Sequence, residues 1–250
     1  MNELFTREER QALFPFFEGK NDPLILAGLQ GIFGRAFISR DGLSALMIVR
    51  DFIFAAGYPS APFFASATKH ASSRFLTVSG EKEWLAIAKA WGAEIEMTRF
   101  DMETPARFDL EKLKKLALPP PGFSLRMMDE ALFHQCLSQS WSADFVAAYP
   151  DFVSFSQNAL GVIALERETP VSGCGAYLHA PGALEIEIGT RPDQRRKGLA
   201  TACGAKFILS CLERGLLPHW DAMNEESRRL AEKLGFGPAH PYPVVCREGE

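Results

Sequence analysis

The chain has 250 residues, a hydrophobic fraction of 47% and a formal net charge of −4. This length and composition describe a folded protein with one large core or two ordinary ones, and they exclude large-scale disorder. The acidic balance argues against a broadly basic nucleic-acid surface, residues 1–10 lack the pattern of a signal peptide, and no segment has the roughly 20 apolar residues of a membrane span. We therefore expect a cytoplasmic protein that binds neither nucleic acid nor membranes.

The N-terminal part of the sequence combines strand and helix patterns. Residues 34–39 and 44–49 predict a hairpin across the turn sequence at residues 40–42, Arg-Asp-Gly. Further predicted elements are a strand over 75–78, a helix over 81–91, a strand over 94–100 and a helix over 110–116.

A connector follows the last of these helices. It consists of Pro119, Pro120, Pro121 and Gly122, and prolines in series favour an extended segment because they cannot continue a helix. We therefore predict two parts, which comprise residues 1–120 and 121–250.

The C-terminal part begins with a strand and a helix and continues as an antiparallel meander. A strand is predicted over 123–128, and Asp129 is the predicted N-cap of a helical segment that runs through Phe145. Three apolar runs separated by turn sequences then predict strands over 160–166, 171–179 and 183–190.

The last strand of the meander has two different faces. Leu184, Ile186 and Ile188 alternate with Glu185 and Glu187, and this period of two directs the apolar side chains to one face and the carboxylates to the other. We expect the apolar face to pack on the core.

A basic, glycine-containing turn follows this strand and is the strongest functional indication in the sequence. Residues 195–200 read Arg-Arg-Lys-Gly-Leu-Ala and begin a predicted helix, whose first N–H groups lack intrahelical acceptors and favour an anion. Arg195, Arg196 and Lys197 add formal charge, and Gly198 lets ligand oxygens approach the backbone. The turn therefore predicts a pyrophosphate site.

The predicted order of elements then continues with a helix over 199–213, a strand over 216–221, a helix from Asn224 to Gly235 and a strand over 241–246. The whole order resembles the GNAT superfamily of acyl-CoA-dependent N-acyltransferases, and two motifs carry the resemblance.

The first motif is the family's acyl-CoA turn, Arg/Gln-x-x-Gly-x-Gly/Ala, which Arg195, Gly198 and Ala200 fill. The second is residues 224–236, which resemble the family's Asn-containing helix that ends in Gly-Phe. The resemblance implies an α/β (α+β) fold with a mixed, mostly antiparallel central sheet flanked by helices. Residues 218–224 resemble the two-part members that include zwittermicin A resistance acetyltransferases, whose N-terminal half matches the family poorly.

The N-terminal part fits such a degenerate GNAT-like half. From Ser44 to Gly92 is 48 residues and from Ala183 to Gly235 is 52, so a strand and a terminal helix fall at nearly matched spacings. Because residues 50–57 contain no basic glycine turn, we predict that this half does not bind CoA. A small unrelated α/β unit is the alternative.

The resemblance also implies which residues would bind acetyl-CoA as a cosubstrate. Ile188 and Thr190 would offer strand backbone groups to the pantetheine arm, and Asn224 with Ser227 would contact the cofactor from the next helix. Backbone N–H groups around Ile188 would stabilise the oxyanion. The residues expected to cradle the pyrophosphate are Arg195, Arg196, Lys197, Gly198, Leu199 and Ala200.

Carboxylates are the candidates for the general base that takes the proton of the attacking amine. We favour Glu185 and Glu187 jointly, and Asp221 at the end of the next strand is a competitor. A solvated or cross-strand charge is the alternative role for each of the three. The family's usual acid, a Tyr on the last helix, is replaced by Ala231, so Ser227 or water would have to protonate the thiolate.

Three functions follow from these features. The first is an acetyl-CoA-dependent N-acetyltransferase that acts on a primary amine of a small molecule. The second, motivated by Ala231, is a catalytically degenerate acyl-CoA-binding sensor or scaffold. The third is a phosphate-binding module for another nucleotide, since basic glycine turns cradle phosphates generally. A homodimer is compatible with each.

No metal is expected, because the five cysteines and five histidines show no ligand spacing. The cysteines are expected to be free, buried thiols.

Overall fold

The computed structural model of the chain describes residues 1–71 and 75–248. Contacts among these residues divide the chain into two compact units. Unit 1 comprises Met1–Arg99 and Pro241–Glu250, and unit 2 comprises Phe100–His240. Two strands, β6 (Ile95–Met102) and β12 (Ala239–Glu248), run from one unit into the other.

Unit 1 alternates strands and helices. In chain order its elements are β1 (Asn2–Leu4), α1 (Arg7–Arg10), a 3-10 helix (Gln11–Phe16), α2 (Pro23–Leu29), β2 (Arg35–Ile38), β3 (Ser44–Val49), β4 (Phe52–Gly57), α3 (Ala61–Thr68), β5 (Phe75–Ser79) and α4 (Lys82–Ala90).

Unit 2 repeats this plan. Its elements are α5 (Leu110–Leu116), β7 (Phe123–Met127), α6 (Glu130–Leu137), a 3-10 helix η2 (Ala143–Phe145), α7 (Phe152–Asn158), β8 (Gly161–Glu166), β9 (Thr169–Ala180), β10 (Ala183–Thr190), a 3-10 helix η3 (Pro192–Gln194), α8 (Leu199–Glu213), β11 (Leu217–Ala222) and α9 (Glu225–Leu234).

The two units have the same sheet topology. In unit 1 the strand order is β1-β2-β3-β4-β5-β12, and in unit 2 it is β7-β8-β9-β10-β11-β6. Neighbouring strands are antiparallel except for β4 with β5 and β10 with β11, which are parallel. The expected mostly antiparallel sheet flanked by helices, with a GNAT-like N-terminal half, is therefore confirmed.

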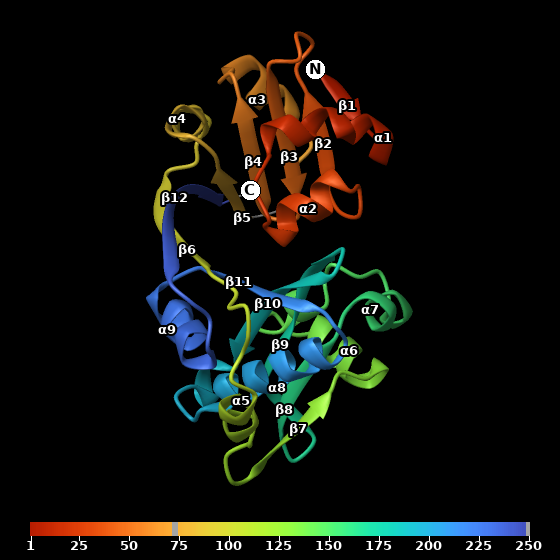
Figure 1. Cartoon of the computed structure of the whole chain (residues 1–250), viewed down its shortest axis with the longest axis vertical. Coiled ribbons are helices and arrows are strands. Elements are labelled where there is room, and N and C mark those ends of the chain that lie inside the picture. The colour runs from red at the N-terminus through yellow and green to blue at the C-terminus, as the bar shows by residue number, and fades with distance from the viewer. Residues whose placement is uncertain (72–74, 249–250) are drawn as a thin grey trace. The chain divides into compact units, whose positions relative to one another are not determined.

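Each unit is completed by the last strand of the other half of the sequence. Strand β12 pairs with β5, with Val245 opposite Val78, and β6 pairs with β11, with Asp101 opposite Asp221. Figure 1 shows the blue end of the chain beside the strand β5 of the first half. We call this arrangement a strand exchange. An unpaired strand edge leaves backbone donors and acceptors exposed, and the exchanged strand covers one such edge in each unit.

Helices and loops cover both faces of the unit 2 sheet. Helix α8 packs on β8, β9 and β10, and α5 packs on α8 (Figure 1). On the opposite face, a Cβ added at Gly173 or Gly175 would meet Phe145 at 2.6 Å. These glycines therefore let Phe145 pack directly on the strand backbone.

Several local expectations are confirmed and others are wrong. The hairpin forms β2 and β3, and Asp129 caps a helix by accepting from the Leu132 N–H at 2.8 Å. That helix ends at Leu137 instead of continuing through Phe145. The segment 50–57, for which no element was predicted, contains β4, because its run of buried apolar residues pairs with β3.

This correction changes the internal alignment of the two halves. Each unit has one parallel pair of strands, β4 with β5 in unit 1 and β10 with β11 in unit 2, so β4 and β10 take the same place in the two sheets. The counterpart of β10 is therefore β4 and not the predicted strand over 44–49. The segment after β4 begins Tyr58-Pro59-Ser60 and also lacks a basic glycine turn.

The compact units do not coincide with the division at residues 120 and 121. Residues 100–120 belong to unit 2, where the rings of Phe108 and Phe236 lie 5.3 Å apart, and residues 241–250 belong to unit 1. The assignment of residues 1–120 and 121–250 to a degenerate and an acetyltransferase domain stays a prediction.

Candidate active site

The basic turn begins helix α8 through an unusual backbone. Gly198 is the N-cap and has φ 84°, in the left-handed region, and Arg196 also has a positive φ of 65°. A Cβ at Gly198 would meet only Pro120 Cγ at 3.9 Å, so glycine is required here by φ and not by crowding. With no side chain to cap the helix, the first N–H groups of α8 are available to an anion.

The three basic residues of the turn point to different partners. The Arg195 Nε donates to the Thr190 carbonyl at 3.4 Å, and Arg196 forms an ion pair with Glu226 of α9 at 3.4 Å. The Lys197 Nζ donates to Gln194 Oε1 at 2.6 Å and lies 5.6 Å from the centre of the Phe123 ring. Arg196 and Glu226 are both largely exposed, so this pair contributes little energy and can open for a ligand.

Strands β10 and β11 separate beside this turn. They pair in parallel from Ala183 opposite Leu217 to Glu185 opposite His219, and β10 continues to Thr190 without further pairing to β11. The Glu185 Oε1 accepts the Asp221 N–H at 3.1 Å, which satisfies a backbone donor just beyond the last strand pair. Among the described strands, β10 therefore pairs only with β9 beyond Glu185.

The two faces of β10 are as the sequence predicts. On one face Ile188 packs toward α8, where a Cβ at Gly204 would meet Ile188 Cδ1 at 3.3 Å. On the other face Gly189 lies against Phe145 and the Trp141 carbonyl. Glu187, two residues before Gly189, lies on that second face and is only partly buried.

Glu185 and Glu187 differ in burial. Glu185 is 3% exposed, and its Oε2 lies 2.5 Å from His219 Nδ1, while His219 Nε2 lies 3.3 Å from Asp101 Oδ1 on β6. Of the two alternative roles considered for Glu185, the structure shows the cross-strand contact, because the adjacent strand β11 places a histidine against it. His219 and Asp101 were absent from the sequence-based candidates, since no motif links them.

Asn224 and Ser227 are part of the local structure of α9. Asn224 is the N-cap and accepts the Ser227 N–H at 3.0 Å. The Ser227 Oγ accepts a hydrogen bond from the buried Trp220 Nε1 at 2.9 Å. Their predicted contacts with a cofactor stay predictions, and the structure adds a stabilising role for each.

Unit 1 has a tryptophan at the position that corresponds to Ser227. Trp84 is the third residue of α4, as Ser227 is of α9, and it is fully buried. Its Nε1 donates to the Gly57 carbonyl at 3.2 Å, at the end of β4. An indole thus occupies the end of the strand that corresponds to β10, and the absence of CoA binding by this half stays a prediction.

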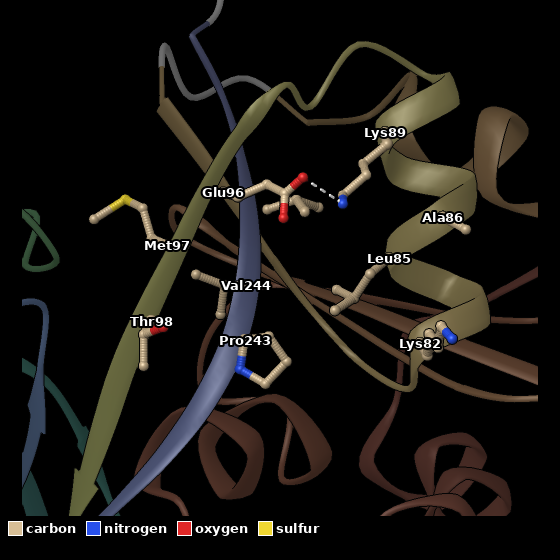
Figure 2. A pocket seen from close by; sticks show the side chains of 10 residues that line it. Lys82, Leu85, Ala86, Lys89, Glu96, Met97, Thr98, Pro243 and Val244 are labelled. Atoms are coloured by element: carbon tan, nitrogen blue, oxygen red, sulfur yellow. Dashed lines mark hydrogen bonds and ion pairs between the residues drawn. The ribbon is translucent and has the colours of Figure 1, made fainter.

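A cavity of about 540 Å³ lies in unit 1. Figure 2 shows it between α4 and the strands β6 and β12, with Lys89 and Glu96 paired at 2.6 Å across one end. Its lining residues are Lys82, Leu85, Ala86, Lys89, Glu96, Met97, Thr98, Pro243, Val244 and Val245. None of the predicted site residues belongs to it.

Thiol and metal chemistry are not indicated by the described residues. All five cysteines are free and buried, and burial raises the pKa of Cys203 and of Cys211 to about 12, so these thiols are poor nucleophiles. Residues 1–71 and 75–248 contain no group of three or more His, Cys, Asp or Glu suited to a metal ion. In the same residues no helix is long and apolar enough to cross a membrane.

Comparison with known proteins decides the family. The family described as GNAT acetyltransferase matches residues 14–245. The chain belongs to the GNAT acetyltransferase family. This family, together with the relative YdfB described next, supports the expected enzyme class, a GNAT-type N-acetyltransferase.

Two relatives resemble this GNAT chain in sequence. The uncharacterized N-acetyltransferase YdfB of Bacillus subtilis (strain 168) is 28% identical over 180 residues, which cover 69% of this chain and 66% of YdfB. The chain thus spans slightly under two thirds of this relative. A GCN5-related N-acetyltransferase-like protein from Streptococcus suis 89/1591 has a crystal structure that matches with a TM-score of 0.87 and 31% identity, over 96% of this chain and 98% of that one.

A more distant structure shares the fold alone. A tandem GNAT protein from the clavulanic acid biosynthesis pathway matches with a TM-score of 0.50 and 15% identity, over 86% of this chain and 79% of that protein.

Proposed function

We propose that this GNAT protein transfers an acetyl group from acetyl-CoA to a primary amine of a small molecule in the cytoplasm. The observation that carries the proposal is the basic turn at the start of α8 beside the diverging strands β10 and β11. The turn offers N–H groups and cations to a pyrophosphate, and the part of β10 that does not pair with β11 offers backbone groups to a pantetheine arm.

In the proposed reaction the amine nitrogen attacks the thioester carbonyl and the carbon–sulfur bond breaks. Glu187 is the group we expect to take the proton, directly or through a water, because it is only partly buried on the face opposite α8. Backbone N–H groups near Ile188 would stabilise the oxyanion. The thiolate takes its proton from water, since the helix position where the family usually has a Tyr is Ala231, which is buried and has no hydroxyl.

Glu185 has a different role in this proposal. Both of its oxygens already accept contacts, from the Asp221 N–H and from His219. It therefore holds the end of the strand pair in place, next to the proposed proton acceptor Glu187. The resemblance to the two-part zwittermicin A resistance proteins would make the acceptor an amine-bearing antibiotic or a similar small molecule.

The test is CoA release from acetyl-CoA across a panel of small amines. We expect Glu187→Gln to lower kcat at neutral pH by roughly 10²-fold, the usual contribution of a general base, with little change in KM for acetyl-CoA. The double variant Arg195→Ala/Gly198→Asp is the negative control and should abolish saturation by acetyl-CoA.

Two outcomes would contradict the proposal. Equal activity of the double variant and the parent would show that the turn is not the cofactor site. Tight binding of acetyl-CoA without acetylation of any amine would instead favour the sensor or scaffold.

A further inference from the structure

A histidine lies between two carboxylates at the point where β10 and β11 separate. His219 Nδ1 is 2.5 Å from Glu185 Oε2, and His219 Nε2 is 3.3 Å from Asp101 Oδ1. The side chain of Glu185 is 4% exposed, that of His219 16% and that of Asp101 53%. The group therefore runs from a buried carboxylate to a partly exposed one within unit 2.

The two carboxylates beside His219 favour an imidazolium, with a proton on each ring nitrogen. An ionised carboxylate only accepts hydrogen bonds, and a neutral imidazole carries a proton on one nitrogen. Both contacts of His219 with ionised carboxylates can be hydrogen bonds only if both ring nitrogens carry protons. An imidazolium would also offset the cost of burying the Glu185 charge, which is high for an isolated carboxylate.

The ring also helps to fix the position of Glu185. The second oxygen of Glu185 accepts the Asp221 N–H at 3.1 Å. The Glu185 carboxylate thus contacts two residues of β11, the side chain of His219 opposite it and the backbone of Asp221. The charged groups that face His219 are Glu185 from β10 and Asp101 from β6, and Asp221 lies two residues further along β11.

Unit 1 provides an internal comparison. The last parallel pair of β4 and β5 is Phe54 opposite Ser79, at the place that Glu185 and His219 occupy in unit 2. The topology therefore forms without a charged pair at this position. The histidine and its carboxylates are found in the unit that also has the basic turn, which indicates a role in the site rather than in holding the strands together.

We propose that His219 is a positioning residue, an imidazolium held by Asp101 that keeps the buried Glu185 carboxylate in place where β10 and β11 separate. The part of this inference that concerns catalysis rests on the proposed acetyl transfer. The charge state of His219 and the placement of Glu185 are properties of the free protein.

The kinetic test compares His219→Gln and Asp101→Asn with His240→Gln. His240 is the matched control because it is an exposed histidine whose Nε2 lies 3.8 Å from a carboxylate, that of Glu103. We expect His219→Gln to lower kcat at neutral pH about tenfold and to change KM for acetyl-CoA less than twofold, because Glu185, on the same strand face as Glu187, loses the contact that holds it in place.

Asp101→Asn should lower kcat by less, and His240→Gln should leave kcat unchanged. Since Asp101 is partly exposed, its variant should fold even if His219→Gln does not. Values of kcat for His219→Gln and Asp101→Asn equal to that of the parent would overturn the proposal.

The spectroscopic test does not depend on turnover. In the ¹⁵N spectrum of the imidazoles at pH 7, with the His219 signals assigned from the His219→Gln variant, both nitrogens should carry protons. A neutral His219 ring would overturn the proposal. If the parent acetylates no amine, the acetyl-transfer function fails while these spectra still decide the charge of His219.

Discussion

Glu185 and Glu187 are two residues apart on one strand face, yet their surroundings give them different chemistry. Glu185 is held by the Asp221 N–H and by His219, whereas Glu187 is only partly buried on the face that Gly189 shares with Phe145. A period of two identifies both as facing away from α8. This period does not show that Glu185 contacts β11 and Glu187 does not pair with it, because the contact depends on the residue at which β10 and β11 stop pairing.

Gly198 has a backbone conformation that residues with a side chain adopt only at a cost in free energy. Its φ of 84° costs an L-residue roughly 1–2 kcal/mol, so Gly198→Ala should destabilise the protein by about that amount. A methyl group in the turn should also weaken CoA binding. Urea unfolding would measure the first effect, and the thermal shift on adding CoA would measure the second.

Gly182→Ala is the matched control for this prediction. Gly182 lies in the β9–β10 turn with φ 75° and has nothing within 4 Å of an added Cβ, so the strain is similar and the pyrophosphate site is untouched. An equal thermal shift with CoA in the two variants would argue against a cofactor role for the turn.

At the scale of elements, α9 is held against β11 by a side chain that the sequence suggested as a cofactor contact and as a possible proton donor. The Ser227 Oγ accepts from the buried Trp220 Nε1. Ser227→Ala would leave a buried donor without this acceptor, which costs about 1–3 kcal/mol. Chemical denaturation should show this loss in the absence of any cofactor.

Ser154→Ala is the matched control, because Ser154 also donates its N–H to the N-cap side chain of a helix, Asp151 on α7. The two substitutions share the same change in helix propensity. Equal stabilities of the two variants would mean that the bond to Trp220 contributes nothing.

The local elements could largely be predicted. The hairpin β2–β3, the meander β8–β10 and the cap Asp129 follow from periods, turn residues and capping patterns that act over a few residues. Strand β4 was missed because its run of apolar residues directly follows β3, with only Arg50 and Asp51 between them. A tight connection of this kind carries no glycine or proline to mark it.

At the scale of the whole molecule, the two halves of the sequence exchange their last strands. A shortened variant that ends at His240 would lack the segment of β12 that pairs with β5 in unit 1. We expect amide hydrogen exchange in β4 and β5 to become much faster, because β5 loses its antiparallel neighbour, and protection in β8, β9 and β10 to be retained.

The reference for this experiment is the full chain with Arg247→Gln, which keeps the strand and removes only the stacking of Arg247 on Trp91, 4.3 Å from the ring centre. Unchanged protection of β5 in the shortened chain would contradict the exchange. Uniform loss of protection in both units would mean that they unfold together.

The sequence by itself determined the hairpin β2–β3, most of the elements from residue 123 onward and the basic turn of residues 195–200, because each depends on neighbours within one turn or one element. Tertiary structure alone decided that β12 completes unit 1, that Trp84 fills the place of Ser227, and that His219 joins Glu185 to Asp101. These depend on which strands become neighbours. Strand pairing joins residues far apart in the chain, and no local pattern records the partner.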